Sequence, residues 1–193
     1  MSTEELGRMY GRFTDYAWRY EGRDVYTVDG EQERIDAFLR SGVVPRKTRD
    51  NNGWIRIVED VCARGASIGR VRAVGRPVTD YTRFEFAAYP DNIAAGEDVQ
   101  VIERQQLDRA WDSVPDFWLF DDTTAFVQHF DEAGRFLGAE RVDNVAPFLE
   151  IRRMLTEPGR TVGAEHYALD SVPQQRRSHV PAPPALHVPS LSH

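Results

Sequence analysis

The spacing of apolar residues changes several times along the chain between a helical and an extended period. Over residues 2–17 the apolar positions share one helical face and follow a capping box, which predicts a first helix. Residues 18–27 end in an alternating, β-prone stretch that predicts a strand. A second helix is predicted to begin after Asp29, its N-cap, and to stop at Gly42.

The middle of the chain predicts a third helix, a strand and a fourth helix. Asn51 or Asn52 caps the third helix, and Gly65 ends it. Residues 68–74 alternate arginines with small apolar side chains, as expected of a strand with one charged face. Residues 78–89 follow a proline and have helical spacing, although a strand is also possible there.

The clearest pattern is a β-meander in the last third of the chain. Three β-prone segments are separated by turn residues: 116–121, 124–130 and 136–142. A strand at 98–102 precedes them, and an amphipathic helix at 144–156 follows. The pattern therefore predicts an α+β fold, with a mixed sheet that ends in an antiparallel β-meander and is flanked by four to five helices.

The composition predicts one domain and a tail. The chain has 193 residues, of which 41% are hydrophobic and 11% aromatic, enough for a packed core. Residues 1–170 are expected to form a single globular α/β domain. Residues 171–193 are rich in proline and poor in apolar anchors, so we expect a disordered tail that is dispensable for folding. A proline-recognition motif for a partner is the alternative there.

Several observations favour a cytoplasmic protein. No apolar run is long enough to span a bilayer, and the acidic N-terminus lacks the apolar core of a signal peptide. Cys62 is the only cysteine, so it forms no internal disulfide, and we expect it to be buried as a small apolar residue. We expect no association with membranes.

The net charge of −7 argues against a general nucleic-acid binder. The charges are unevenly distributed, because residues 64–83 are basic and residues 97–132 are acidic. The two stretches are expected to pair in the fold. We therefore predict no direct binding to duplex DNA.

The first candidate site lies where the strand at 68–74 leads into the next helix. Arginines gather there with two carboxylates and a tyrosine, and such strand–helix junctions often bind anions. The candidate ligand-binding residues of this segment are Arg70, Arg72, Arg76, Asp80, Tyr81, Arg83 and Glu85. Alternatively, the same residues form a salt-bridged network that holds helix to sheet.

The second candidate cluster is Trp118, Asp121 and Asp122 at a predicted strand end. Two adjacent carboxylates can bind a divalent cation, but a turn is the better interpretation, because their side chains point to opposite faces of an extended chain. His129 has no nucleophile motif beside it and is expected to be structural. We predict no metal site and no cofactor, since nucleotide-binding loops, nucleophile elbows and zinc motifs are missing from the sequence.

Four linked segments resemble an uncharacterised actinobacterial family known as a domain of unknown function: 68–72, 77–86, 92–98 and 116–122. The resemblance covers about residues 10–168. It implies a regulatory accessory role, because members of that family are often encoded near helix-turn-helix regulators, which makes such a regulator a possible partner.

A fainter resemblance is to half of a phospholipase-D-like domain. That superfamily's catalytic His-x-Lys motif is missing, since His129 is followed by Phe130 and Asp131. The resemblance therefore implies a similar order of elements without the chemistry.

Three functions remain open. The first is a non-enzymatic regulatory or accessory domain that binds a small anionic ligand or a partner protein through residues 70–85 and 118–122. The second is a hydrolase or nuclease-like effector that uses acidic residues or a histidine: Asp80, Glu85, Asp121, Asp122 or His129. The third is a pure protein–protein interaction module, with the tail or an aromatic patch as its contact.

Overall fold

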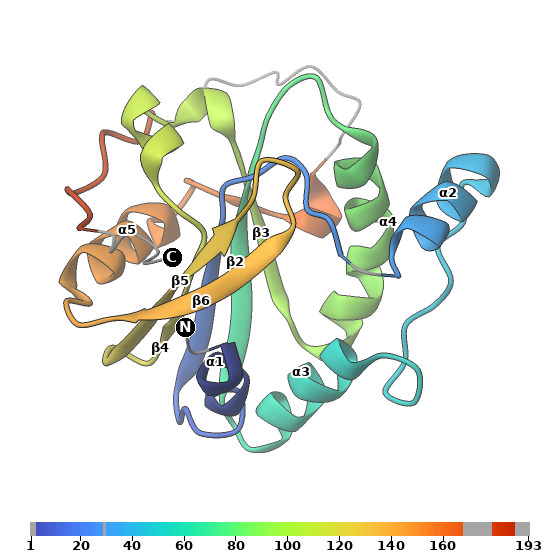
Figure 1. Cartoon of the computed structure of the whole chain (residues 1–193), viewed down its shortest axis with the longest axis horizontal. Coiled ribbons are helices and arrows are strands. Elements are labelled where there is room, and N and C mark those ends of the chain that lie inside the picture. Colours follow the sequence, from blue (N-terminus) through green and yellow to red (C-terminus); the bar gives the residue numbers. More distant parts are fainter. Residues whose placement is uncertain (1–2, 29, 168–178, 188–193) are drawn as a thin grey trace.

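A seven-stranded mixed sheet organises the chain in the computed structural model, which describes residues 3–28, 30–167 and 179–187 (Figure 1). The strands are β1 (Tyr16–Glu21), β2 (Ser67–Val74), β3 (Asp98–Glu103), β4 (Phe117–Phe120), β5 (Thr124–Phe130), β6 (Phe136–Val142) and β7 (Val162–Gly163). Their order is β6-β5-β4-β1-β2-β3-β7. The strands β1, β2 and β3 are parallel, whereas β4, β5 and β6 form an antiparallel meander. The predicted α+β class is confirmed.

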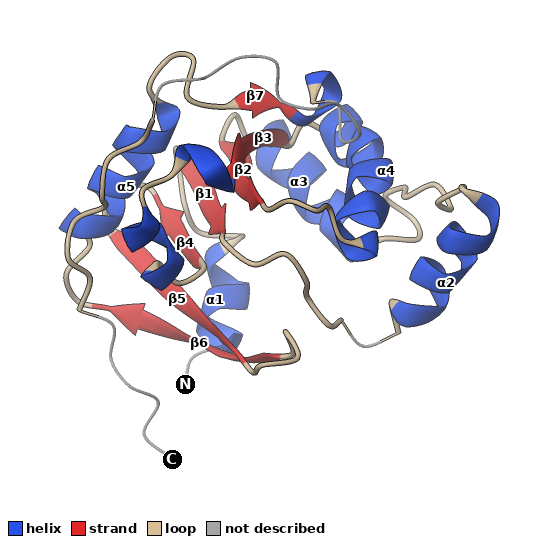
Figure 2. Ribbon diagram, turned by 90° about the horizontal axis from the view of Figure 1, so that it is seen from above, coloured by secondary structure: helices blue, strands red, loops and turns tan. Residues whose placement is uncertain are grey.

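Helices cover both faces of this sheet. They are α1 (Thr3–Met9), α2 (Gln32–Ser41), α3 (Gly53–Ala63), α4 (Asp80–Ala95) and α5 (Ala146–Thr156), with 3₁₀ turns η1 (Arg104–Gln106), η2 (Arg109–Ser113) and η3 (Ala164–His166). Figure 2 shows α5 on one side of the sheet and α1, α3 and α4 on the other, with α2 beyond α4. None of the described helices is long and apolar enough to cross a bilayer.

Strand alternation gives the two faces different chemistry. The face under α5, here the α5 face, carries Trp18 and Tyr20 of β1, which are buried in one apolar cluster with Phe148 of α5. The opposite face, here the α4 face, carries Arg19 and Glu21 of the same strand. Polar side chains are therefore buried on only one side of β1.

The α4 face is itself divided along the strands. Near the start of β1 it is apolar, because Ala17 and Ile68 pack against Val58 and Val61 of α3. Charged and tyrosine side chains replace the apolar ones toward the end of β1. The change in chemistry leaves the polar half between the sheet, α2, α3 and α4.

The first helix is shorter than predicted. It ends at Met9, and the apolar residue Ala17 belongs to β1 rather than to the helix. Asp121, at the β4–β5 turn with φ 50°, accepts the backbone N–H groups of Thr14, Asp15 and Tyr16, the last of which begins β1. Because those N–H groups are bonded to a side chain, they are not available for further helical turns.

Other local predictions have mixed outcomes. Of the two residues proposed as the cap of α3, Asn52 is the one that caps it. Its Oδ1 accepts the Ile55 N–H at 3.1 Å. The helix α4 runs further than predicted, past Pro90 to a C-cap at Gly96. The expectation that Cys62 is buried is wrong, because its position on α3 is exposed. Asp29, the proposed cap of α2, lies outside the described residues.

Part of the expected tail packs against the domain. Val180 is fully buried in the apolar cluster of the α5 face and forms a parallel bridge with Leu107. The Trp111 Nε1–H donates to the carbonyl oxygen of Pro181 at 2.8 Å. The expectation of disorder is therefore wrong for residues 179–187, because the apolar contacts of Val180 and Leu186, with carbonyl acceptors that proline retains, suffice to dock them. Residues 171–178 and 188–193 lie outside the described residues.

Candidate functional site

A cavity of about 380 Å³ opens on the polar half of the α4 face. This volume falls in the range that small-ligand sites occupy, about 300–1,000 Å³. Strands β1, β2, β4 and β5, helices α3 and α4 and the segments around α2 all contribute to its lining. The lining residues are Tyr10, Arg19, Glu21, Tyr26, Thr27, Val28, Glu31, Arg34, Lys47, Asn52, Trp54, Arg70, Tyr81, Glu85, Asn92, Trp118, Gln128, Phe130, Gly134 and Phe136.

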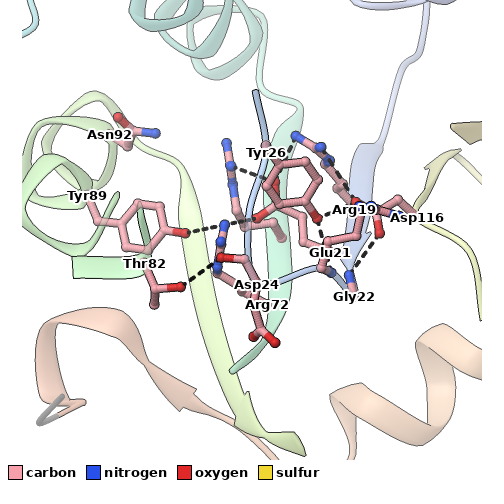
Figure 3. Close-up of polar contacts among 12 residues, drawn as sticks. Arg19, Glu21, Gly22, Asp24, Tyr26, Arg72, Thr82, Tyr89, Asn92 and Asp116 are labelled. Atoms are coloured by element: carbon pink, nitrogen blue, oxygen red, sulfur yellow. Dashed lines mark hydrogen bonds and ion pairs between the residues drawn. The ribbon is translucent and has the colours of Figure 1, made fainter. Parts of the chain in front are cut away.

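The floor of the cavity is an ionic network centred on the Glu21 carboxylate (Figure 3). Its oxygens lie 2.8 Å from Arg19 Nη1, 3.1 Å from Arg70 Nη1 and 3.2 Å from Arg72 Nη1. The register of β1 with β2 explains this grouping, since Arg19 is opposite Arg70 and Glu21 is opposite Arg72. One carboxylate thus faces three guanidinium groups.

Glu97 supplies a second negative charge. Its Oε1 lies 2.6 Å from Arg70 Nη2, and its Oε2 accepts hydrogen bonds from Trp54 Nε1 at 2.7 Å and Asn92 Nδ2 at 2.8 Å. Arg70 is therefore bonded through Nε, Nη1 and Nη2. These contacts join α3 and α4 to the sheet through one buried carboxylate.

Asp116 supplies the third negative charge, just before β4. It accepts the Gly22 N–H at 2.9 Å and a short hydrogen bond from the Tyr26 hydroxyl, and it lies 3.9 Å from Arg19 Nη2. The three arginines on the sheet thus face three carboxylates. The charges of the floor balance without a bound anion.

The network decides which carboxylates stay ionised. Burial opposes ionisation of Glu21, but the charges of Arg19, Arg70 and Arg72 outweigh it and lower the pKa of Glu21 to about 2. Burial raises the pKa of Asp116, with Arg19 and the Tyr26 hydrogen bond opposing the rise. Glu21 is therefore the permanent negative centre of the floor.

Arg72 is held between aromatic rings. Its guanidinium carbon lies 5.4 Å from the centroid of Tyr26 and 5.5 Å from that of Tyr81, within cation–π range. Its Nη1 also lies 3.4 Å from the Tyr89 hydroxyl (Figure 3). Arg72 is buried behind Glu21 and supports the floor without lining the cavity.

Two buried polar atoms of the lining have no hydrogen-bond partner within the described part of the chain. They are the donor Nε of Arg19 and the acceptor Oε1 of Gln128. Both atoms are covered by the protein, with almost no surface accessible from the cavity. Unpartnered buried polar atoms are costly, so these two reduce the stability of the lining.

The mouth of the cavity mixes charges with apolar side chains. Glu31, Arg34, Lys47 and Glu85 contribute the charges. Burial and then the nearby Glu85 charge raise the pKa of Glu31, with Lys47 and Arg34 opposing the rise. Apolar contact area comes from partly exposed side chains such as Val28, which is 52% exposed.

The structure brings together only some of the predicted site residues. Arg70, Tyr81, Glu85 and Trp118 line the cavity, and Arg72 supports it from behind. The prediction that Arg70 and Arg72 share a strand face is confirmed by their common partner Glu21.

The other residues of the first cluster lie elsewhere. Arg76 pairs with Glu103 at 2.9 Å and bonds the Tyr167 hydroxyl at 2.9 Å. Asp80 is exposed at the start of α4, and Arg83 lies one turn later, outside the cavity lining. The salt-bridge interpretation therefore describes Arg76 better than a ligand site does.

Asp121 and Asp122 form the β4–β5 turn rather than a cation site. Burial of Asp121 is outweighed by the backbone N–H groups of Tyr16 and its neighbours, which lower its pKa. Asp122 accepts a hydrogen bond from the Tyr16 hydroxyl at 2.7 Å. No cluster of three metal-ligating side chains occurs in residues 3–28, 30–167 and 179–187.

The cavity lacks the usual nucleophile–base pairs of hydrolases. No histidine, cysteine or serine is found in its lining as described. His129 lies on β5 with its Nε2 3.4 Å from Glu140 Oε2, outside that lining. Of the residues proposed for hydrolysis, only Glu85 reaches the cavity.

Sequence reasoning missed Arg19, Glu21, Glu97 and Gln128. A signal was present, because Trp18-Arg19-Tyr20-Glu21 alternates aromatic and charged residues within a predicted strand. Such alternation predicts one polar face. Burial of that face depends on α4, which no local pattern reveals.

Comparison with protein families gives one match. Residues 4–162 match the family model of a domain of unknown function, DUF6879. The match extends from α1 to the start of β7 and includes every strand that forms the cavity floor. Among curated proteins, no relative matches the chain.

Proposed function

The chain belongs to the DUF6879 family, and from that premise we propose that it is a non-enzymatic accessory domain that binds a small ligand in the cavity on the α4 face. The observation that carries the proposal is the cavity of about 380 Å³, whose floor is the buried ionic network around Glu21 and Glu97 and whose lining includes several aromatic side chains. A cleft with a few convergent polar groups and aromatic walls is the usual form of a small-molecule site.

The lining favours a planar, polar ligand. Trp54, Trp118, Tyr26, Tyr81 and Phe130 all contribute aromatic surface to the cavity. Aromatic walls bind flat rings through stacking and edge contacts, which add to the burial of apolar area. The fixed charges of the floor limit which polar groups a bound ring can carry.

The mouth favours a single negative charge on the ligand. Lys47 Nζ donates to Asn92 Oδ1 at 3.5 Å, and the Arg34 guanidinium carbon lies 5.9 Å from the Phe84 ring centroid. Both side chains line the cavity and keep further N–H donors for an anionic substituent. Glu31 and Glu85 lie at the same mouth and repel a multiply charged anion. A ring with one acidic group fits this balance better than a polyphosphate does.

The regulatory part of the proposal is supported by the family resemblance. A helix-turn-helix regulator is the proposed protein partner, and the proposed compartment is the cytoplasm. Since α3 and α4 both contact the floor through Glu97, a ligand that tightens the floor would also stabilise the positions of these two helices. Through this coupling, binding of a ligand would affect the outer surface of the domain.

The test is native mass spectrometry of the full chain purified from its own host cells. We expect a retained small molecule in the natural protein. Val28→Trp, which fills the mouth from an exposed position, should remove it. Val43→Trp is the matched control, because Val43 is 65% exposed and lies outside the lining.

Two results would contradict the proposal. One is the absence of any retained species, together with no stabilisation of the protein by a small-molecule filtrate of the same cells. The other is equal retention in both tryptophan variants, which would place the ligand outside this cavity.

A further inference from the structure

A second binding surface lies on the α5 face, where the chain holds a segment of its own tail. Residues 179–187 run beside α5 and the turns η1 and η2, and Figure 1 shows them in red next to α5. Within this segment Val180 alone is buried, in the apolar cluster that contains Leu107 and Trp111. We call the surface formed by residues 106–111 and Arg160 the tail groove.

The groove pairs with the main chain of the segment. The Val180 N–H donates to the Gln106 carbonyl at 2.7 Å, and the Asp108 N–H donates to the Val180 carbonyl at 3.0 Å. Pro181 favours this pairing, because a residue that precedes proline is biased toward the extended conformation. The dipeptide Val-Pro thus supplies an apolar anchor that is already shaped for the groove.

Two side chains of the groove bind carbonyl groups on either side of that anchor. The Trp111 Nε1–H donates to the Pro181 carbonyl at 2.8 Å, and Arg160 Nη1 donates to the His179 carbonyl at 2.7 Å. An aromatic donor that binds a carbonyl of an extended, proline-containing segment is a recurring mode of peptide recognition. The hydrogen bonds read the backbone, so the valine pocket is the part that selects the sequence.

The segment is held at the surface rather than enclosed. A cleft of about 350 Å³ separates residues 181–184 from the charged side chains of α5. Pro181 and Ala182 are exposed. The segment therefore leaves the groove with the loss of one fully buried side chain, and the helices and strands of the domain stay in place.

The tail carries this anchor three times. Val-Pro occurs at residues 172–173, 180–181 and 188–189, at intervals of eight residues. All three lie beyond the region that matches the family model, which ends at residue 162. The described residues show one docking position, beside Leu107, and the middle dipeptide occupies it. Each chain thus has more Val-Pro dipeptides than described positions that hold one.

We propose that the tail groove is a recognition site for an extended Val-Pro segment, and that a second copy of this chain supplies such a segment from its tail. Residues 180–181 fill the groove of their own chain at an effective concentration on the order of millimolar. Residues 172–173 and 188–189 are the segments offered to a second copy. Association of the natural chain with itself is therefore weak, and it strengthens when the acceptor lacks anchors of its own.

The experiment uses a full-length acceptor with an emptied groove. In the ¹⁵N-labelled variant Val172→Asp/Val180→Asp/Val188→Asp, carboxylates replace all three tail anchors, and an apolar pocket excludes them. Unlabelled natural chain is the donor, and the Trp111 indole N–H signal is the readout. We expect a saturable shift of the Trp111 signal, while the signal of Trp54, on the α4 face, stays in place.

The matched control is the donor Val172→Asp/Val188→Asp. It keeps Val180, which its own groove occupies, so it should bind the acceptor at least about tenfold more weakly than the natural donor does. The triple variant as donor should not bind at all.

A second measurement needs no emptied acceptor. Natural chain with ¹³C-labelled valine methyl groups is titrated with a synthetic peptide of residues 179–187. An excess of peptide should displace the segment, so the Val180 methyl signals should move from their buried position. The same peptide with Val180→Asp is the control and should leave them unchanged.

Three results overturn the inference: no shift of the Trp111 signal with natural donor, equal affinity of the two donors, or Val180 methyl signals that do not respond to excess peptide. If the peptide displaces the segment and neither donor binds, the assignment of a second copy is wrong and the groove selects another chain. These outcomes leave the proposal for the cavity on the α4 face unaffected, because the two sites share no residue.

Discussion

The two faces of the central sheet are built from the same strands but hold the structure together differently. On the α5 face, Trp18 and Tyr20 of β1 join Phe117 and Leu119 of β4 in an apolar cluster. On the α4 face, the residue between those two of β1 is Arg19, in a network with buried counterions. The comparison shows that one strand can bury apolar side chains on one face and charged side chains on the other, when the residues packed against the two faces differ.

The energetics of the two faces differ accordingly. Burying a large apolar side chain contributes about 1.5–3 kcal/mol, so the α5 face is a direct source of stability. A buried ion pair roughly breaks even, because desolvation offsets the attraction between the charges. The ionic floor is thus a weak source of stability, and its value to the protein is better explained by the cavity it forms.

The largest expected effect comes from breaking the ionic floor at its centre. Glu21→Gln leaves three buried guanidinium groups around a neutral amide and should lower the free energy of unfolding by about 4 kcal/mol. Urea denaturation measures this change. Glu132→Gln, in the exposed β5–β6 turn, is the control and should have almost no effect. A loss below about 1 kcal/mol at Glu21 would mean that the network is already solvated.

The same carboxylate should give a pH signature. Its pKa falls from 4.5 to about 2 on folding, so its contribution is complete above pH 4.5 and is lost as the pH drops toward 2. A difference of about 2.5 pKa units corresponds to about 3 kcal/mol. The stability gap between the natural protein and Glu21→Gln should therefore narrow over this range. A gap that stays constant would argue against an ionised Glu21.

A comparable change on the apolar face should act on stability alone. Leu119→Ala removes a fully buried side chain and should cost about 3 kcal/mol in urea denaturation. Because Leu119 points away from the cavity, the folded variant should retain as much small molecule as the natural protein. Loss of the retained molecule at temperatures where the variant is folded would show that the two faces are coupled.

The smallest expected effect concerns the docked proline-rich segment. Val180→Ala removes two methyl groups from the α5-face cluster and should cost about 1.5 kcal/mol. Leu186→Ala is a milder companion, since Leu186 packs only partly buried against the same cluster. If thermal melting shows no change for Val180→Ala, the segment is dispensable, as the composition alone suggested.

The sequence predicted the strands themselves better than the way in which they pair in the sheet. The meander strands β4, β5 and β6 and the shared face of Arg70 and Arg72 follow from alternation, which is a local property. The position of β1 between β2 and β4 depends on pairings over about 50 and about 100 residues, which local patterns do not encode.

The candidate site was only half predicted for the same reason. The arginines of residues 70–76 were recognised as a cluster, but their counterions come from β1, β3 and the loop that follows α4. Those counterions divide the cluster, since Arg76 is drawn to Glu103 and Arg70 to Glu21 and Glu97. Composition around residue 180 likewise indicated disorder, because a single buried valine leaves no periodic pattern.

The four tryptophans allow the central claim to be measured on both faces at once. Trp54 and Trp118 line the cavity, whereas Trp18 and Trp111 belong to the cluster of the α5 face. The measurement is the shift of the four indole N–H signals in ¹⁵N-labelled protein when a small-molecule filtrate of the host cells is added. The account predicts that the Trp54 and Trp118 signals move while those of Trp18 and Trp111 stay in place. Movement confined to Trp18 and Trp111, or no movement of any indole signal, would contradict a ligand site on the α4 face.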